Sequence, residues 1–302
     1  MLPIVHHPAY APPIPSDHRF PMDKFRRVMK RLLDESIVKP MQVQRPEPAP
    51  RRCLECVHDP DYVNAILTQT LDPKHARRIG LPITEAVAAR SLAANGGTML
   101  TARLALEHGL ACNTAGGSHH AFAEEGSGFC VFNDVAVAAR FLLEESRVER
   151  ILVVDLDVHQ GDGTAKIFEN DARVFTFSMH CRTNFPARKQ TSDLDIALEP
   201  GTGDEAYLRT LEETLPALLS LHRPDLVFYN AGVDPHCEDK LGRLDLTDDG
   251  LFRREHFVLE TCVANGTPTA CVMGGGYAPD PDRLAHFHTI LHRVASEVFQ
   301  TR

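Results

Sequence analysis

The sequence predicts an α/β fold, with a mostly parallel sheet covered by helices on both faces. Short apolar runs typical of buried strands alternate with longer segments whose apolar residues recur at helical spacing. Several of the short runs end in small, polar or charged residues, and open parallel sheets bind ligands beyond the carboxyl ends of their strands. No internal repeat or low-complexity tract interrupts the alternation, so we expect residues 1–302 to form one domain.

The positions of the expected elements follow from these two patterns. Short apolar runs predict buried strands at 110–114, 151–155, 174–178, 226–230 and 269–273. Apolar residues three and four positions apart predict helices at 25–33, 208–219 and 284–294. The proline-rich segments 12–15 and 40–50 are expected to be extended loops that border a surface groove, because proline interrupts both helices and central strands.

The composition is typical of a soluble globular protein, and we expect it in the cytoplasm. Hydrophobic residues make up 43% and charged residues 24% of the chain, and no segment is long and apolar enough to span a membrane. The first residues lack the basic and apolar regions of a secretory signal. The net charge of -9 leaves no basic stripe, which argues against direct nucleic-acid binding. Eight cysteines, with a single CxxC at Cys53 and Cys56, fit thiols in a reducing compartment better than a zinc site.

Two expected strands are followed by histidines and carboxylates. The segment AGGSHHAF follows the first of them, and its two glycines allow a tight turn before His119 and His120. The segment DLDVHQGDG follows the second, and Asp157 and His159 alternate so that both point to the same side of an extended chain. Asp155 lies one step deeper on that side. Unpaired buried charges are costly, so these acidic residues require a cation, a hydrogen-bonded histidine or solvent.

The numbers of histidines and carboxylates in these segments favour two carboxylate–histidine pairs beside a metal. Asp155, together with Asp162 beyond the glycine turn, supplies two carboxylates for the two histidines of AGGSHHAF. Asp157 and His159, joined by Asp234 after a third strand, form a set of three nitrogen and oxygen donors with one position left open. That set is typical of catalytic zinc. Taken alone, Asp234 is equally a turn or helix-capping residue.

A glycine-rich segment follows the last expected strand. In TACVMGGGYAPD, three glycines let the backbone pass close to a ligand before Tyr277. A phenol beside a metal can donate a hydrogen bond to a carbonyl oxygen as that oxygen becomes an anion. The pattern is not GxGxxG, and no Lys-Ser/Thr pair follows, so a phosphate-binding loop is not expected.

These motifs resemble, in order, the zinc-dependent histone deacetylase and acetylpolyamine amidohydrolase superfamily. The matching segments are GGSHHAF, GFCVFNDVAVAA, VVDLDVHQGDGT, FTFSMH, YNAGVD, DKLGRL and GGGY, within residues 96–277. The resemblance implies an arginase/deacetylase-like fold and one catalytic Zn2+. It also implies hydrolysis of acetyl or longer fatty-acyl groups from the lysine side chains of proteins or peptides.

The resemblance also implies a role for each motif residue. The implied zinc ligands are Asp157, His159 and Asp234; the implied pairs are His119 with Asp155 and His120 with Asp162; the implied carbonyl polariser is Tyr277. In that scheme zinc polarises the amide and acidifies water, and His120 removes the proton and later protonates the leaving amine. His119 tunes charge and position.

Further correspondences concern the substrate channel and a second ion. The implied channel walls are Gly128, Phe129, Phe185 and Leu241, although the two phenylalanines are equally ordinary core residues. A structural monovalent cation such as K+ is implied near Asp155, Asp157, His159, Ser178 and Met179. Gln160 and the segment 184–208 resemble the class IV branch, which is associated with fatty-acyl removal. No acidic rim residue like that of class I enzymes is evident.

Three alternatives remain beside lysine deacylation. A two-manganese ureohydrolase is contradicted by Gly161 and Gly232, which stand where further metal ligands would be needed. An acetylpolyamine amidohydrolase acting on small acylated amines requires acidity at the channel mouth, for which the candidates are Glu124, Glu125, Glu238 and Asp239. A binding protein that has lost activity is disfavoured because every chemical position holds a competent residue. The oligomeric state cannot be predicted.

Overall fold

A computed structural model describes residues 1–15 and 17–301 and contains one eight-stranded parallel sheet. The strand order is β2-β1-β3-β8-β7-β4-β5-β6, and every neighbouring pair is parallel. The strands are β1 Ile4–Val5, β2 Val43–Gln44, β3 Leu110–Asn113, β4 Ile151–Asp155, β5 Val174–Cys181, β6 Leu194–Leu198, β7 Leu226–Asn230 and β8 Thr269–Val272. The predicted α/β fold with a mostly parallel sheet is therefore confirmed.

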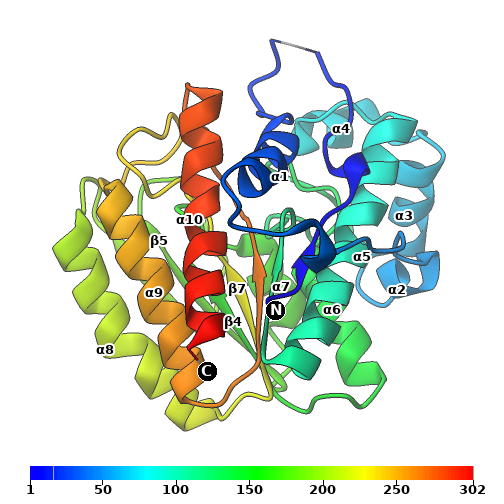
Figure 1. The fold of residues 1–302 in the computed structure, drawn as a ribbon. Helices are drawn as coiled ribbons and strands as arrows, with labels where there is room; N and C mark the ends of the chain where they lie inside the picture. Colours follow the sequence, from blue (N-terminus) through cyan, green and yellow to red (C-terminus); the bar gives the residue numbers. More distant parts are fainter. Residues whose placement is uncertain (16, 302) are drawn as a thin grey trace.

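Helices cover both faces of the sheet (Figure 1). On one face α8, α9 and α10 pack side by side and α1 packs on α10; on the other, α5 packs against α6, β3 and β8. The longer helices are α1 Lys24–Asp34, α5 Glu85–His108, α6 Asp134–Glu144, α8 Asp204–His222, α9 Asp248–Ala264 and α10 Pro281–Gln300. The shorter ones are η1 Pro8–Tyr10, η2 Pro40–Gln42, α2 Arg51–Glu55, α3 Pro60–Leu67, α4 Pro73–Ile79 and α7 Asp162–Phe168.

Local sequence accounts for where these helices begin and end. Asp280 caps α10 by accepting from the backbone N–H groups of Asp282 and Arg283, and Pro281 occupies the first helical position. Thr84 caps α5 in the same way, through the N–H of Val87. Gly109 ends α5 in a left-handed conformation, with φ of 75°, which glycine adopts without strain.

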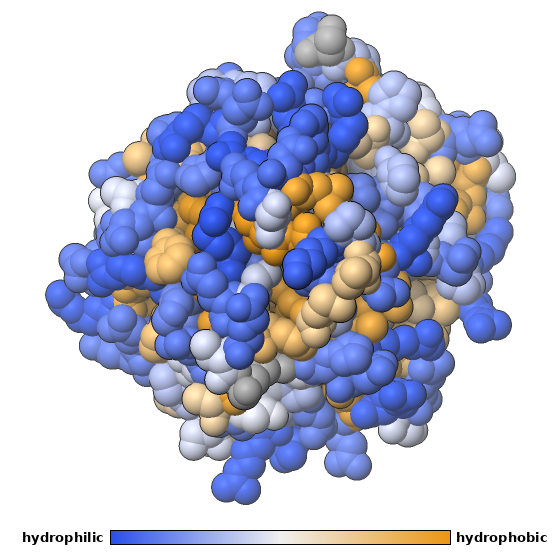
Figure 2. Space-filling model, viewed as in Figure 1, coloured by the Kyte–Doolittle hydropathy of each residue, from blue (hydrophilic) through white to orange (hydrophobic). Residues whose placement is uncertain are grey.

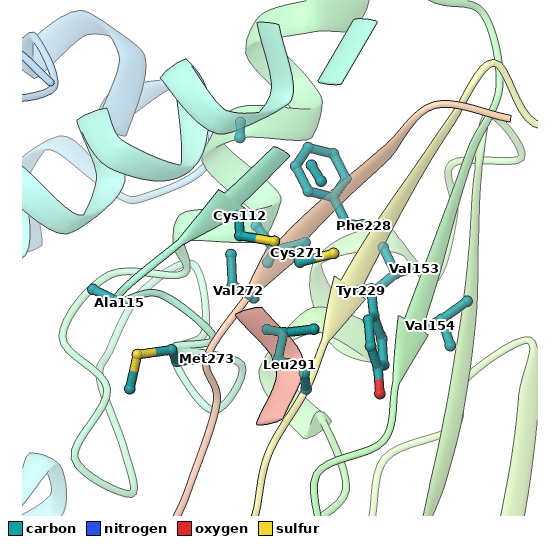
Figure 3. Packing of buried hydrophobic residues seen from close by; sticks show 14 of the residues in the cluster. Cys112, Ala115, Val153, Val154, Phe228, Tyr229, Cys271, Val272, Met273 and Leu291 are labelled. Atoms are coloured by element: carbon teal, nitrogen blue, oxygen red, sulfur yellow. The ribbon is translucent and has the colours of Figure 1, made fainter. Parts of the chain in front are cut away.

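The core lies between the central strands and the helices (Figure 3). Cys112 of β3 is in register with Cys271 of β8, and Val153 of β4 with Phe228 of β7. These side chains and Leu291 of α10 are almost completely buried. Each large apolar side chain buried in this way contributes about 2 kcal/mol of transfer free energy. The central strands are apolar on both faces because both faces are covered.

Not every sequence expectation holds in detail. The strand expected at 174–178 continues to Cys181, and segment 40–50 contains η2 and β2 as well as extended chain. Segment 12–15 is extended as expected, and its prolines line a cavity of about 470 Å³ beside α1 and the start of α10. The face shown in Figure 2 is mostly hydrophilic, with apolar side chains gathered near its middle. Within the described residues no helix combines the length and apolar character needed to cross a membrane.

The strand order brings four distant segments together. β8 lies between β3 and β7, and β7 lies between β8 and β4, so these four strands are consecutive neighbours in the sheet. Because all are parallel, the segments AGGSHH, GGGY, AGVD and LDVH leave the same edge side by side. The chemistry-bearing motifs of the sequence therefore converge at the centre of the carboxyl edge.

Candidate active site

Two aspartates and a histidine form a tight cluster at this edge. Asp157 and His159 follow β4, and Asp234 follows β7. His159 Nδ1 lies 3.0 Å from Asp157 Oδ1 and 3.1 Å from Asp234 Oδ2. One ligand atom from each residue lies within 4.8 Å of the other two, and all three residues are buried. The sequence-predicted metal ligands are thus neighbours in the structure.

The surroundings of this cluster fit a cation. Asp234 Oδ2 is buried and makes no hydrogen bond of acceptable geometry, although His159 Nδ1 is close. Burial and the neighbouring Asp157 raise the pKa of Asp234 above its ordinary value. A Cβ atom on Gly275 would lie 2.1 Å from Asp234 Oδ2 and 2.6 Å from Asp157 Oδ2, so only glycine leaves space at that position. An unpartnered oxygen, like-charge repulsion and a glycine-lined hollow are together what a bound metal would resolve.

The first carboxylate–histidine pair lies directly beside the cluster. His119 Nδ1 is 2.6 Å from Asp155 Oδ2, and Asn230 Nδ2 donates to Asp155 Oδ1 at 2.9 Å. Burial lowers the pKa of His119, but the charges of Asp155 and Asp157 outweigh it and raise that pKa to about 9. These two carboxylates therefore favour the protonated form of the His119 ring.

The second pair has the opposite charge state. His120 Nδ1 is 2.6 Å from Asp162 Oδ1. Burial and the positive charge of His119 lower the pKa of His120 to about 4. His120 is thus a neutral imidazole at neutral pH, with Nδ1–H directed to Asp162 and Nε2 free to accept a proton. Two adjacent histidines with separated pKa values are the arrangement expected of an acid–base site.

Tyr277 stands between this cluster and the cavity above it. Its ring centroid is 6.3 Å from that of His159 and 5.9 Å from that of Phe129. The backbone N–H of Tyr277 donates to Asp239 Oδ2 at 2.6 Å. Burial and the nearby Asp234 hold the pKa of the phenol well above its usual range, so the hydroxyl remains a donor at neutral pH.

A cavity of about 400 Å³ leads from the surface to these groups. His120, His159 and Tyr277 form its inner end. The sequence-predicted wall residues line its sides: Gly128, Phe129, Phe185 and Leu241. The Phe185 ring meets the His120 ring nearly perpendicularly, with centroids 4.8 Å apart. Both phenylalanines therefore line this cavity, and Phe129 also packs against the hydrophobic core.

A second cavity adjoins the first at His120 and Tyr277. Its volume is about 30 Å³, and Asp157, His119 and Arg90 are among its lining residues. Arg90 is buried, donates from Nε to the carbonyl of Tyr10 and lies over the Phe25 ring. The space beyond the cluster is thus small and partly charged.

Residues named for a monovalent cation are close together along the sheet. Asp155 of β4 is in register with Ser178 of β5, and Met179 follows on the same strand. Ser178 Oγ is 3.0 Å from His180 Nδ1. All five residues named for this site are buried.

Of two residues that support Tyr277, sequence reasoning missed Lys24 and expected Asp239 in a different role, at the channel mouth. Lys24, at the start of α1, is buried and donates from Nζ to the carbonyl of Gly274 at 3.1 Å, with the ammonium 5.6 Å from the Tyr277 ring centroid. Burial lowers the pKa of Lys24 to about 8. Asp239 accepts from the N–H groups of Leu241 and Gly242 as well as from Tyr277. The sequence signal for Lys24 was a charged residue next to an apolar helix face. The signal for Asp239 was its place in the segment DKLGRL.

The acidic residues proposed for the channel mouth are not among the lining residues of the cavity. Glu125 pairs with Arg78, and Glu238 pairs with Arg283. Glu124 lines a separate cavity, and Asp239 is turned inward. Within the part of the chain that the structure describes, no carboxylate lines the 400 Å³ cavity.

The positions that would supply ligands for a second metal ion are occupied by Gly161 and Gly232. A Cβ on Gly161 would lie 2.4 Å from Asp155 Oδ2, and one on Gly232 would lie 2.6 Å from Asp157 Oδ2. The described residues contain one other cluster with metal-ligand spacing, formed by His236, Glu238 and Asp248. The guanidinium of Arg283 bonds both of its carboxylates, which explains their proximity without an ion.

Comparison with known proteins gives consistent matches along the chain. Residues 18–292 match the family described as the histone deacetylase domain. The chain is 57% identical to an uncharacterized protein of Picosynechococcus sp., covering 98% of this chain and 99% of that protein. It is 30% identical to histone deacetylase 2 of Arabidopsis thaliana, covering 88% and 71%. The crystal structure of an HDAC homolog from Aquifex aeolicus superposes with a TM-score of 0.81 at 25% identity, covering 98% and 84%.

Proposed function

Because this chain belongs to the histone deacetylase family, we propose that it removes acyl groups from the lysine side chains of proteins or peptides with one zinc ion. The family relationship makes the protein a hydrolase of the deacetylase type. The observation that carries the proposal is the convergence of three metal-ligating side chains, two carboxylate–histidine pairs and a phenol at the end of one cavity. The single domain 1–302 is then the catalytic domain.

We propose Asp157, His159 and Asp234 as the zinc ligands. They offer the nitrogen and oxygen donors that zinc accepts, and the unpartnered Asp234 oxygen supports a cation there. A bound zinc ion would supply Lewis-acid polarisation of the acyl carbonyl and would acidify water. The proposed K+ near Asp155 and Ser178 would be structural, and the burial and register of those residues support it.

In this proposal His120 moves the proton. Its neutral imidazole accepts a proton from the attacking water at Nε2, while Asp162 holds the Nδ1–H and stabilises the imidazolium that forms. The same proton then passes to the departing lysine amine. His119, protonated and held by Asp155, fixes a positive charge beside the reacting carbonyl.

Tyr277 would stabilise the developing oxyanion. Its hydroxyl remains protonated at neutral pH and can donate to the carbonyl oxygen as negative charge accumulates there. Asp239 and Lys24 would hold the backbone around Tyr277 in place, through the contacts described above.

The small inner cavity favours acetyl over fatty-acyl groups. A space of about 30 Å³ holds roughly two water molecules and accommodates a methyl group, but not a long hydrocarbon chain. Arg90 lines the same space, and a charged wall disfavours an apolar tail. The resemblance to the class IV branch implies long acyl groups, whereas the size of this cavity supports short ones.

No observation favours acetylpolyamine hydrolysis. A polycationic substrate needs acidic groups at the entrance, and the cavity described here has none among its lining residues. We propose a cytoplasmic location, which the eight free thiols support.

The proposed function is tested by turnover of one lysine peptide carrying an acetyl, octanoyl or myristoyl group, with an acetylated polyamine in parallel. We expect the zinc-loaded protein to hydrolyse the acetyl peptide fastest, and a chelator to abolish the reaction. Preference for the myristoyl peptide would overturn the assignment of acyl length. Preference for the polyamine would overturn the lysine assignment, and no hydrolysis of any acyl amide would overturn the function.

A further inference from the structure

The mouth of the substrate cavity is ringed by cations. Four arginines line the cavity, whereas no carboxylate does so within the described residues: Arg19, Arg77, Arg78 and Arg243. The chain as a whole has the opposite balance, with 41 acidic and 32 basic residues. The local charge at the mouth is therefore contrary to the charge of the protein.

These arginines come from three separate segments. Arg77 and Arg78 lie in the last turn of α4, Arg19 precedes α1, and Arg243 follows β7. The guanidinium carbon of Arg19 lies 5.5 Å from the ring centroid of the wall residue Phe129. The backbone carbonyl of Arg243 accepts from Gly201 N–H at 2.8 Å, which fixes the loop that carries it. The positive charge at the opening thus comes from three parts of the chain that meet there.

Elsewhere on the protein, some exposed arginines have an acidic partner, as in the pairs Arg51–Glu55 and Arg182–Glu199, whereas others, such as Arg52 and Arg188, form no ion pair among the described residues. At the mouth, Arg78 pairs with Glu125, but the described residues include no acidic partner for Arg19, Arg77 or Arg243. A position at a helix C-terminus accounts for Arg77 through the helix dipole, but Arg19 and Arg243 are in loops. The distinctive feature of the opening is therefore that four arginines gather there with no lining carboxylate among the described residues, and not that some of them lack an ion pair.

We infer that the substrate is anionic outside the channel: the acyl-lysine that enters lies in a peptide segment with flanking aspartate or glutamate residues. This inference rests on the proposed function and specifies its substrate. Opposite charges around a binding site raise the rate of productive encounter and suppress partners of the same sign. The three unpaired arginines lie on three segments, so a peptide with several acidic side chains matches them better than a small molecule with one carboxylate.

The test compares three acetyl-lysine peptides that differ only in flanking residues: acidic, neutral or basic. We expect kcat/KM to be on the order of tenfold higher for the acidic than for the neutral peptide at low ionic strength, and lowest for the basic one. The preference should shrink at about 0.5 M salt, because exposed charges are screened. Equal kcat/KM for the three peptides would overturn the inference. Hydrolysis of all three would still leave the proposed function intact, whereas hydrolysis of none would refute that function first.

Charge reversal at the rim provides the matched variants. Arg77→Glu and Arg243→Glu, alone and combined, should lower kcat/KM for the acidic peptide and raise it for the basic one, each measured relative to the neutral peptide. Arg147→Glu makes the same charge change in the loop before β4, at the opposite edge of the sheet, and should leave the order of the peptides unchanged. The same shift in Arg147→Glu as in the mouth variants would show a general charge effect and overturn the inference.

A small anionic substrate distinguishes a peptide from a single carboxylate. Nα,Nε-diacetyl-lysine has no free amine, carries one carboxylate and has no flanking residues. We expect it to be hydrolysed less efficiently than the acidic peptide. Equal or higher kcat/KM for this small anion would overturn the peptide assignment.

Discussion

The charged groups at the inner end of the cavity, which we call the floor, differ in their contacts from the arginines at its exposed opening, which we call the rim. At the floor, Asp155 and Asp162 are buried and each holds a histidine at 2.6 Å. At the rim, Arg19 and Arg243 are exposed, and the described structure gives neither an acidic partner. Groups held by one another keep a fixed geometry, as a chemical step requires, whereas unpaired surface charges remain available to a ligand. The inner end of the cavity is therefore suited to the chemical step, and its opening to the choice of substrate.

The largest effect should come from removing a metal ligand at the floor. Asp157→Ala should lose bound zinc and reduce turnover by more than about 1,000-fold, because no other described carboxylate can replace this ligand. Metal content after gel filtration and peptide turnover measure the two effects. Asp162→Asn, at the same floor but outside the ligand set, should keep zinc. Full zinc content in Asp157→Ala would contradict the ligand assignment.

A smaller effect is expected where the floor meets the cavity. Tyr277→Phe should keep zinc and lower kcat by about 100- to 1,000-fold, the usual cost of one oxyanion donor. Steady-state kinetics together with metal analysis separate this result from loss of the ion. Unchanged kcat would show that the phenol does not act on the carbonyl.

Asp239 contacts both the cavity wall, through Leu241, and the floor, through Tyr277. Asp239→Asn would place an amide where a carboxylate now accepts three backbone N–H groups, from Leu241, Gly242 and Tyr277. Loss of one hydrogen bond to a charged group should lower kcat by roughly tenfold through displacement of Tyr277, with zinc retained. Glu238→Gln, the adjacent exposed residue paired with Arg283, serves as the control and should be near parent activity. Equal kcat in the two variants would exclude a positioning role for Asp239.

The smallest expected effect on activity at neutral pH concerns His58, a buried histidine outside the cavity lining whose role is in stability. His58 Nδ1 lies 2.9 Å from the carbonyl of Phe122, and Nε2 accepts from Asn133 N–H at 3.0 Å, which requires a neutral ring. Burial lowers the pKa of His58 from 6.5 to about 4. The unfolded chain therefore takes up this proton first, so the stability contribution is complete above pH 6.5 and is lost as pH falls to about 4. The loss should amount to about 3 kcal/mol.

Denaturant unfolding at several pH values checks this sign. His58→Gln should be less stable than the parent at pH 7.5, and the difference should narrow toward pH 4. A difference that stays constant between these pH values would show that His58 does not take up a proton in this range.

The sequence predicts the central strands and the floor, but not the periphery or the rim. β4 and β7 are continuous apolar runs, and their bounds agree with the expected ones. β1 and β2 have two residues each, too few for any periodicity, and β6 is a half-exposed edge strand. Their existence depends on neighbouring strands and not on their own residues.

Tertiary packing also explains the missed helix α5 and the missed rim. α5 contains Gly96 and Gly97, which as local signals weaken a helix. In the fold, a Cβ on Gly97 would lie 2.0 Å from Tyr10 Oη, so glycine there permits close packing of the N-terminal segment. The rim arginines are single residues in unrelated segments, and nothing in the sequence near Arg19 or Arg243 reveals that they face one cavity.

The strand order has a consequence for how the protein acquires its activity during folding. β3 pairs with β8, which joins Leu110 and Thr269, and β4 pairs with β7, which joins Ile151 and Leu226. Closing such long loops makes folding slow and delays these contacts until most of the sheet has formed. The three proposed metal ligands follow β4 and β7, so they come together only when these two strands pair. Under the proposed function, a bound metal would therefore stabilise only molecules in which this part of the sheet is already assembled.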